Sequence, residues 1–123
     1  MNVLFVDDQM SVLDGIAAGI SFQELGIDNV RYATGADRAM DILRAVPIDI
    51  MLCDIEMPGE DGLQLIQRAQ TLYPELLTIL LTSHTEFEYA QNSVRLGCFD
   101  YIVQPAPYDV IGRRSAPGLA ALL

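Results

Sequence analysis

Short runs of apolar and β-branched residues alternate along the chain with segments of helical periodicity. Most of these runs carry apolar side chains at successive positions, which is typical of strands buried on both faces. Such strands occur in parallel sheets covered by helices, so the pattern predicts an α/β fold. The predicted strands are residues 3–6, 29–33, 48–53, 76–81 and 99–103.

Helical spacing of apolar residues fills the intervals between the predicted strands. Pro47 and Pro74 end the second and third helices, and Gly97 has the position of a C-cap glycine after the fourth. Each connection between parallel strands should be a right-handed crossover. The predicted helices are residues 11–22, 36–46, 63–73 and 87–96.

The C-terminal segment departs from this alternation. A fifth helix is expected to begin near Tyr108, but Gly112 and the pair Pro117-Gly118 oppose its continuation. We therefore expect an irregular fifth helix followed by loose chain or a short terminal helix. Whether Leu123 is the natural C-terminus stays open.

Polar residues stand at the points where the predicted strands end. In a parallel sheet the carboxyl ends of the strands meet at one edge, which is where ligands bind. These polar side chains are therefore expected to converge in space from four separate strands. They are Asp7, Asp8, Asp54, Thr82, Ser83 and Gln104.

Three carboxylates in one pocket repel one another. Two unit charges about 4 Å apart raise the energy by roughly 4 kcal/mol at an effective dielectric constant of about 20. A hard divalent cation relieves this repulsion, and all-oxygen ligands suit Mg²⁺. Such a site favours phosphoryl transfer, with Asp54 as the nucleophile and Thr82 as a hydroxyl donor to the phosphoryl oxygens.

Each of these residues also has a purely structural interpretation. Asp7 and Asp8 stand where they would cap the helix that follows. Asp54 is compatible with a solvated loop, and Thr82-Ser83 with a cap for the fourth helix. The convergence of four strand ends is what favours a functional site.

Composition and charge narrow the class of protein. With 123 residues, 51% of them hydrophobic, residues 1–123 are expected to form one domain with a single core. No apolar run reaches the roughly 18 residues that cross a bilayer, and no signal peptide is evident, so we expect a cytoplasmic protein without membrane contact. Seven basic and 17 acidic residues give a net charge of −10, which disfavours nucleic-acid binding by this domain.

Cysteine and histidine give no sign of a second site. Cys53 and Cys98 lie far apart in apolar settings, so buried, reduced cysteines are expected rather than a metal or redox pair. His84 is expected to be a solvated loop residue near the mouth of the predicted pocket.

Several motifs resemble those of bacterial response-regulator receiver domains. Asp7-Asp8 is similar to the paired acids of that family, residues 54–62 match its D-x-x-M-P-x-x-D-G loop, and residues 81–83 match its switch hydroxyl. Residues 96–102 resemble its approach to the fifth strand. The resemblance covers about residues 3–109, with 108–123 atypical, and implies a flavodoxin-like (βα)5 three-layer sandwich with a five-stranded parallel sheet of order 2-1-3-4-5.

The resemblance also implies a role for each residue of the site. Asp54 would be the phosphoacceptor for a sensor histidine kinase. Asp8 and Asp54 would bind Mg²⁺ directly, the backbone carbonyl of Glu56 would be a third ligand, and Asp7 would act mainly through water. No enzyme activity is implied beyond the domain's own phosphorylation and dephosphorylation.

The resemblance also implies a conformational switch within the domain and a separate output domain. Thr82 would move toward the phosphoryl group and Tyr101 would change rotamer, which would alter the surface of the fourth helix, fifth strand and fifth helix. The same surface is the most plausible homodimer contact. Residues 22–26 and 86–91 resemble receivers that precede AraC-type DNA-binding domains, so a transcriptional output domain outside this chain is expected.

One position departs from the family pattern. Receivers normally carry a lysine before the proline that follows the fifth strand, whereas this chain has Gln104 there and no lysine anywhere. Glutamine donates hydrogen bonds but brings no charge. Two hypotheses therefore stay open. The first is a phosphorylated receiver in which Mg²⁺ supplies the missing positive charge, and the second is an atypical receiver that acts as a phosphorylation-independent interaction or dimerisation module.

A phosphatase with an aspartate nucleophile is a weaker interpretation. The segment Met57-Pro58-Gly59, which follows Asp54-Ile55-Glu56, lacks the hydroxyl residue expected there in such enzymes.

Overall fold

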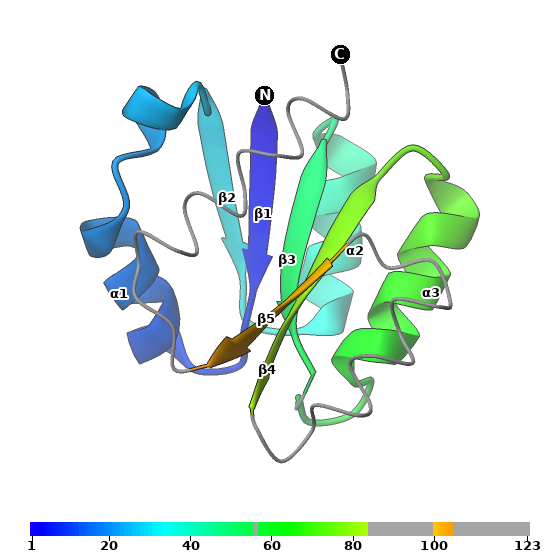
Figure 1. Ribbon diagram of the computed structural model, residues 1–123. Coiled ribbons are helices and arrows are strands. Elements are labelled where there is room, and N and C mark those ends of the chain that lie inside the picture. The colour runs from blue at the N-terminus through cyan, green and yellow to red at the C-terminus, as the bar shows by residue number, and fades with distance from the viewer. Residues whose placement is uncertain (56, 84–99, 105–123) are drawn as a thin grey trace.

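A five-stranded parallel sheet forms the centre of the protein (Figure 1). The computed structural model describes residues 1–55, 57–83 and 100–104, with the backbone alone for 82–83 and 100–104. The strands lie in the order β2-β1-β3-β4-β5, which confirms the predicted flavodoxin-like order. Their bounds are Asn2–Val6 (β1), Asn29–Ala33 (β2), Ile50–Asp54 (β3), Leu77–Ser83 (β4) and Asp100–Gln104 (β5).

Helices cover both faces of the sheet. In Figure 1, α1 lies on one side of the strands, and α2 and α3 lie on the other. Within the described part of the chain, no helix is both long and apolar enough to cross a bilayer. The helices predicted at 87–96 and from residue 108 lie outside the described residues. The described helices are Met10–Gly19 (α1), the 3₁₀ turn Phe22–Leu25 (η1), Ala36–Ala45 (α2) and Gly62–Leu72 (α3).

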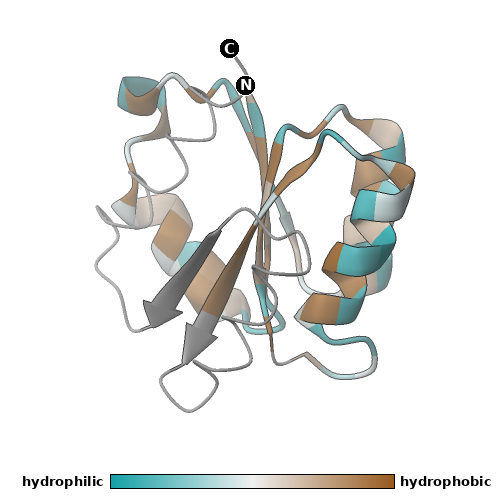
Figure 2. Cartoon of the chain, turned by 45° about the vertical axis from the view of Figure 1, so that its right-hand side comes forward, coloured by the Kyte–Doolittle hydropathy of each residue, from teal (hydrophilic) through white to brown (hydrophobic). Residues whose placement is uncertain are grey.

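Alternate residues of the strands contribute to two hydrophobic cores, one on each face of the sheet, rather than to the single core expected from the composition. In β1, Leu4 and Val6 pack with residues of α2 and α3, whereas Val3 and Phe5 pack with residues of α1. All four side chains are fully buried. Successive strand residues point to opposite faces, so burial of both faces requires the continuous apolar runs seen in the sequence. In Figure 2 the central strands are largely brown, whereas the helices beside them mix brown, white and teal.

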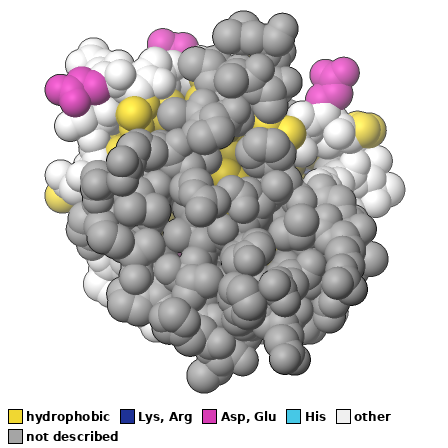
Figure 3. Space-filling view, in the orientation of Figure 1, with side chains coloured by type: hydrophobic (Ala, Val, Ile, Leu, Met, Phe, Trp, Pro, Cys, Tyr) yellow, Lys and Arg dark blue, Asp and Glu magenta, His cyan; other side chains and the backbone are white. Residues whose placement is uncertain are grey.

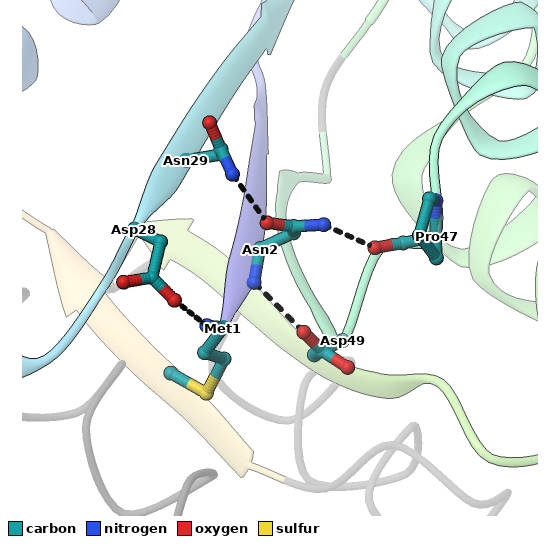
Figure 4. Close-up of polar contacts among 6 residues, drawn as sticks. All are labelled: Met1, Asn2, Asp28, Asn29, Pro47 and Asp49. Carbon is teal, nitrogen blue, oxygen red and sulfur yellow. Dashed lines mark hydrogen bonds and ion pairs between the residues drawn. The ribbon is translucent and has the colours of Figure 1, made fainter.

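Hydrogen bonds join the amino ends of β1, β2 and β3 (Figure 4). The Asn2 side chain donates to the carbonyl oxygen of Pro47 at 2.8 Å and accepts from Nδ2 of Asn29 at 3.0 Å. The backbone N–H of Asn2 donates to Oδ2 of Asp49 at 2.7 Å. These bonds hold together the short loops that precede the three strands. The loops lie at the amino ends of the strands, and the predicted site residues lie at the opposite, carboxyl ends.

The first helix is shorter than predicted. A helix was expected over residues 11–22, but α1 ends at Gly19, and Ile20 has an extended backbone with φ −116° and ψ 128°. The 3₁₀ turn that follows brings the ring of Phe22 to a centroid distance of 5.8 Å from the ring of Phe5. Packing against the sheet therefore overrides the helical periodicity in this segment.

The third and fourth strands extend further toward their carboxyl ends than predicted. Asp54 belongs to β3 and Ser83 to β4, although both were expected just beyond their strands. Backbone pairing explains the difference, because Asp54 pairs with Leu81 and Ser83 with Gln104 in the parallel ladder. A polar side chain does not interrupt this ladder, because the ladder is formed by backbone groups.

Two leucines of α3 provide a matched test of the core. Leu65 is fully buried, whereas Leu72 is 57% exposed. Replacing Leu65 with alanine is expected to lower the free energy of unfolding by about 2–5 kcal/mol, because it leaves a cavity in the core. The same change at Leu72 should lower it by about 1 kcal/mol or less. Urea denaturation followed by circular dichroism measures both, and equal losses would contradict the assigned burial of α3.

Candidate functional site

Three carboxylates lie together at the carboxyl ends of β1 and β3. Asp7, Asp8 and Asp54 each present one carboxylate oxygen, and these oxygens lie within 4.8 Å of one another. The parallel register brings them there, because Val6 pairs with Cys53 and the next residues along the two strands are Asp7 and Asp54. The predicted convergence of these three acids is therefore confirmed.

The three carboxylates differ in their exposure to solvent. Asp7 is only 3% exposed, Asp54 is half-buried and Asp8 is exposed. Between described residues, neither Asp7 nor Asp8 forms a salt bridge with a basic side chain. The cluster thus combines a buried, a half-buried and an exposed carboxylate, and its all-oxygen donors suit a hard divalent cation such as Mg²⁺.

Backbone hydrogen bonds fix the position of Asp7. Its N–H donates to the carbonyl oxygen of Ala33 at 3.0 Å, and its Oδ1 accepts from the N–H of Gln9 at 2.9 Å. Burial raises the pKa of the Asp7 carboxyl above its ordinary value, and the neighbouring Asp8 raises the pKa further. The hydrogen bond from Gln9 opposes this shift but does not cancel it. A bound cation would favour the ionised form that burial disfavours.

The interpretation of Asp7 and Asp8 as helix caps is wrong. The helix α1 begins at Met10, and its N-cap residue, Gln9, makes no side-chain capping hydrogen bond. Asp7 bonds instead to the backbone N–H of Gln9, ahead of the helix. The interpretation of Asp54 as a solvated loop acid is also wrong, because it is the half-buried last residue of β3.

A glycine lets the start of α3 press against the end of β3. The N–H of Gly62 donates to the carbonyl oxygen of Ile55 at 2.8 Å. A Cβ atom at position 62 would lie 2.1 Å from the carbonyl oxygen of Asp54 and 2.9 Å from the Cα atom of Ile55. No side chain fits there without displacing the backbone of Asp54 itself. In the same loop Gly59 has a φ of 80°, which also favours glycine.

Side chains at the start of α3 anchor the other end of this loop. Asp61 accepts a hydrogen bond from the N–H of Gln64 at 2.9 Å, and the Gln64 side chain accepts one from the N–H of Asp61 at 3.0 Å. This capping box satisfies donors that the first turn leaves free. Glu60 forms a salt bridge of 3.0 Å with Arg68 further along the helix. The spacing of Asp61 and Gln64 is a signal for the box in the sequence, whereas the matched loop motif marks Gly62 without showing which backbone it contacts.

The remaining predicted site residues are placed by their strands or lie outside the described part. Thr82 lies at the end of β4 and Gln104 ends β5, so their backbones reach the same edge of the sheet as Asp54. Tyr101 lies in β5, paired with Leu80 of β4. Glu56 and His84, like the side chains of Thr82, Tyr101 and Gln104, lie outside the described residues, and the roles of all five stay predictions.

Cys53, next to the cluster, is a structural residue. It is fully buried and packed in the core on the α2 and α3 side, as expected from its apolar setting. Its Sγ lies 3.2 Å from the carbonyl oxygen of Asp54. Cys98 lies outside the described residues.

Comparison with known proteins agrees with this arrangement. The sequence model of the family described as response regulator receiver domain matches residues 3–114. The uncharacterized transcriptional regulatory protein YesN of Bacillus subtilis (strain 168) is 32% identical over 104 residues, which cover 85% of this chain and 28% of YesN. Across the first curated relatives, the chain spans between 22% and 28% of their length.

Solved structures are similar over nearly the whole chain. A two component transcriptional regulator AraC from Clostridium phytofermentans ISDg has a TM-score of 0.90 and 25% identity, covering 98% of this chain and 93% of that one. The REC domain of AraT, a response regulator from Geobacillus stearothermophilus, has a TM-score of 0.87 and 30% identity, covering 98% and 94%. The first of these descriptions agrees with the narrower resemblance to AraC-type regulators.

Neutralising Asp7 is expected to stabilise the metal-free protein at neutral pH. The folded protein takes up a proton on Asp7 at a higher pH than the unfolded chain does, so ionised Asp7 lowers the free energy of unfolding above its raised pKa. Asp7→Asn should therefore be more stable than the parent at pH 7, because the amide oxygen still accepts from Gln9. The advantage should shrink as the pH falls toward 3.8, the ordinary value for the group.

Urea denaturation in EDTA between pH 7 and pH 4 measures this difference. Glu75→Gln is the matched control, because Glu75 is exposed and lies just before β4, at the opposite end of the sheet. A stability difference for Asp7→Asn that is independent of pH, or one shared by Glu75→Gln, would contradict the prediction.

Replacing Gly62 with alanine is expected to disturb the site as well as the stability. The new Cβ would lie 2.1 Å from the carbonyl oxygen of Asp54, so α3 and the end of β3 must separate. We expect the free energy of unfolding to fall by about 1–3 kcal/mol, as for overpacked sites. Amide NMR signals of residues 54–62 should shift in the folded variant. Gly35→Ala is the control, since a Cβ there meets no atom within 4 Å, and equal effects of the two changes would refute the contact.

Proposed function

The chain belongs to the response regulator receiver domain family, and on that premise we propose that it accepts a phosphoryl group on Asp54. One observation carries the proposal: the carboxylates of Asp7, Asp8 and Asp54 lie within 4.8 Å of one another at the carboxyl edge of the sheet. Fold stability alone does not account for three acids at this place, because their mutual repulsion opposes it.

The Asp54 carboxylate is the nucleophile in the proposed reaction. One of its oxygens attacks the phosphorus of a phosphohistidine on a sensor kinase, or of a small acyl phosphate. The bond from phosphorus to the donor nitrogen or oxygen breaks, and its electron pair leaves with the donor. The product is an aspartyl phosphate, which water later hydrolyses to restore Asp54. The domain thus acts on no separate substrate and catalyses at most its own phosphorylation and dephosphorylation.

The acidic cluster fits Mg²⁺. In our proposal Asp8 and Asp54 hold the ion directly, the carbonyl oxygen of Glu56 is a third protein ligand, and Asp7 acts mainly through water. The ion supplies positive charge that offsets the negative charge of the phosphoryl oxygens. Asp8 is exposed to solvent, whereas Asp7 is buried. This difference is consistent with direct binding of the ion by Asp8 and an indirect role for Asp7.

Thr82 and Tyr101 are proposed to carry the signal away from Asp54. Thr82 donates its hydroxyl to the phosphoryl group, and Tyr101 changes rotamer in response. Both lie in neighbouring strands, β4 and β5, that pair in register beside β3. The change reaches the surface of the fourth helix, fifth strand and fifth helix, through which two copies are proposed to dimerise.

The output is proposed to be transcriptional. YesN is named a transcriptional regulatory protein, and the solved structure from Clostridium phytofermentans ISDg is described as a transcriptional regulator. The chain spans about a quarter of its curated relatives, so a DNA-binding output would belong to another part of the full protein. The net charge of −10 on this chain is consistent with DNA binding by another part of the protein. We propose that the protein works in the cytoplasm, with a sensor histidine kinase as its partner.

A second function is favoured by Gln104. This residue ends β5, at the same edge of the sheet as Asp54, and the chain holds no lysine to replace the missing charge. In this alternative the domain is an atypical receiver whose interactions or dimerisation do not depend on phosphorylation. The two candidates differ in a single measurable property, the capacity of Asp54 to be phosphorylated.

Incubation with acetyl phosphate and Mg²⁺ is expected to add one phosphoryl group to the protein. Intact-protein mass spectrometry detects the addition, and Asp54→Asn should show none. EDTA should suppress the gain in mass, because the cation offsets charge repulsion at the site. Gln104→Lys should raise the phosphorylated fraction or prolong its lifetime, because an ammonium group pairs with phosphoryl oxygens.

Glu75→Gln is the matched control for loss of one negative charge away from the site, and it should be phosphorylated like the parent. If neither the parent nor Gln104→Lys gains mass while both remain folded, phosphorylation of Asp54 is refuted and the phosphorylation-independent module stands. A mass gain that persists in Asp54→Asn would assign the modification to a different residue.

A further inference from the structure

We infer that a pocket between β2 and α2 binds a small organic anion, with a carboxylate or phosphate head on an apolar body. The pocket has a volume of about 380 Å³, within the range of small-ligand sites. The described residues that line it belong to β2, to α2 and to the C-cap position that follows α2, so it is separate from the carboxylate cluster and does not rest on the proposed phosphorylation. Its lining includes Val30, Arg31, Tyr32, Arg38, Asp41 and Ile42.

Two arginines that form no salt bridge with a described residue supply the positive charge of this pocket. The described part of the chain contains four arginines, and two of them form salt bridges, Arg44 at 3.2 Å and Arg68 at 3.0 Å. The other two, Arg31 and Arg38, make no salt bridge with a described residue, and both line the pocket. Guanidinium groups match the geometry of carboxylate and phosphate oxygens, so this pair is suited to an oxyanion.

The fold explains why Arg31 faces α2. Arg31 pairs with Leu4 in the parallel ladder, and Leu4 packs in the core on the α2 and α3 side. Paired residues of neighbouring strands point to the same face, so Arg31 points to that side too. Because β2 is the outermost strand, Arg31 is exposed to solvent there. Arg38 lies one turn before Ile42 on α2, so the two share one side of the helix.

The open edge of β2 adds backbone donors. The carbonyl oxygen of Ala33 accepts from the N–H of Asp7, so the backbone groups of Ala33 face β1. Successive residues of a parallel strand direct their backbone groups to opposite sides, so Val30 and Tyr32 direct theirs to the open edge of the sheet. Both residues line the pocket. Within the described part of the chain these two N–H groups donate to no backbone acceptor outside the sheet ladder, so they are proposed as further donors to an anion beside the two arginines.

The rest of the lining defines the body of the ligand. Ile42 and Val46 give the pocket an apolar wall. Asp41 also lines it, but its Oδ1 accepts from Arg44 at 3.2 Å, so this negative charge is already compensated. By contrast, the described charged side chains that can be seen in Figure 3 are all acidic. The pocket thus brings together two of the four arginines of the described residues, neither of them in a salt bridge with a described residue, on a chain with a net charge of −10.

Titration of the ¹⁵N-labelled chain with phenyl phosphate and with benzoate tests the inference by amide NMR, in EDTA without Mg²⁺. Saturable shifts are expected at residues 30–32 and 38–46, and added salt should weaken binding. Arg31→Gln and Arg38→Gln should each weaken it by about tenfold, the loss expected for a charged hydrogen bond. Arg68→Gln is the matched control and should bind like the parent. Asp54→Asn should also bind like the parent, which separates this result from the phosphorylation test.

Three outcomes would overturn the inference. The first is the absence of saturable shifts at these residues in the folded protein. The second is equal binding of benzyl alcohol, which would show an apolar pocket indifferent to charge. The third is an equal loss in Arg68→Gln, which would show attraction to overall positive charge rather than to this pocket. If phenyl phosphate binds and benzoate does not, or the reverse, the inference holds and the head group is identified.

Discussion

The register of the parallel pairing between β1 and β3 is the constraint on which the carboxylate cluster depends. Val3 pairs with Ile50 and Val6 with Cys53, so Asp7 and Asp54 follow side by side. A slip of one residue would turn every side chain of one strand to the opposite face of the sheet. The two hydrophobic cores forbid this, because both faces of these strands are buried. Apolar packing in the interior thus holds together, at its edge, three charges that repel one another.

The strands could be predicted well from the sequence because their signal is local. β2 begins and ends where predicted, at Asn29 and Ala33, although it is not a continuous apolar run and contains the polar residues Asn29 and Arg31. The end of α1 could not be predicted in this way. Ile20 continues its apolar periodicity after Val12 and Ile16, yet the helix ends before it and Phe22 packs against Phe5, a contact between residues distant in sequence. The periodicity shows which residues are apolar, but packing against the sheet determines where the helix ends.

Some features of the candidate site could likewise be predicted from the sequence, and others could not. The proximity of Asp7, Asp8 and Asp54 follows from strand ends in a parallel sheet, so it could be predicted. The burial of Asp7 and its hydrogen bond from Gln9 decide its raised pKa, and neither can be read from a pattern of residue types. The need for glycine at position 62 arises from a backbone that approaches from another element. Contacts of this kind are properties of the folded chain alone.

Arg31 has a consequence for the behaviour of the protein at high concentration. β2 is an outer strand, and the outer edge of a sheet is a template on which strands of other molecules can assemble. Arg31 stands at the middle of this five-residue strand. If two molecules met through β2 in antiparallel fashion, their arginines would face each other, and like charges directly opposite destabilise such a pairing. The shortness of β2 and the charge at its centre thus oppose aggregation of the protein through the outer edge of the sheet.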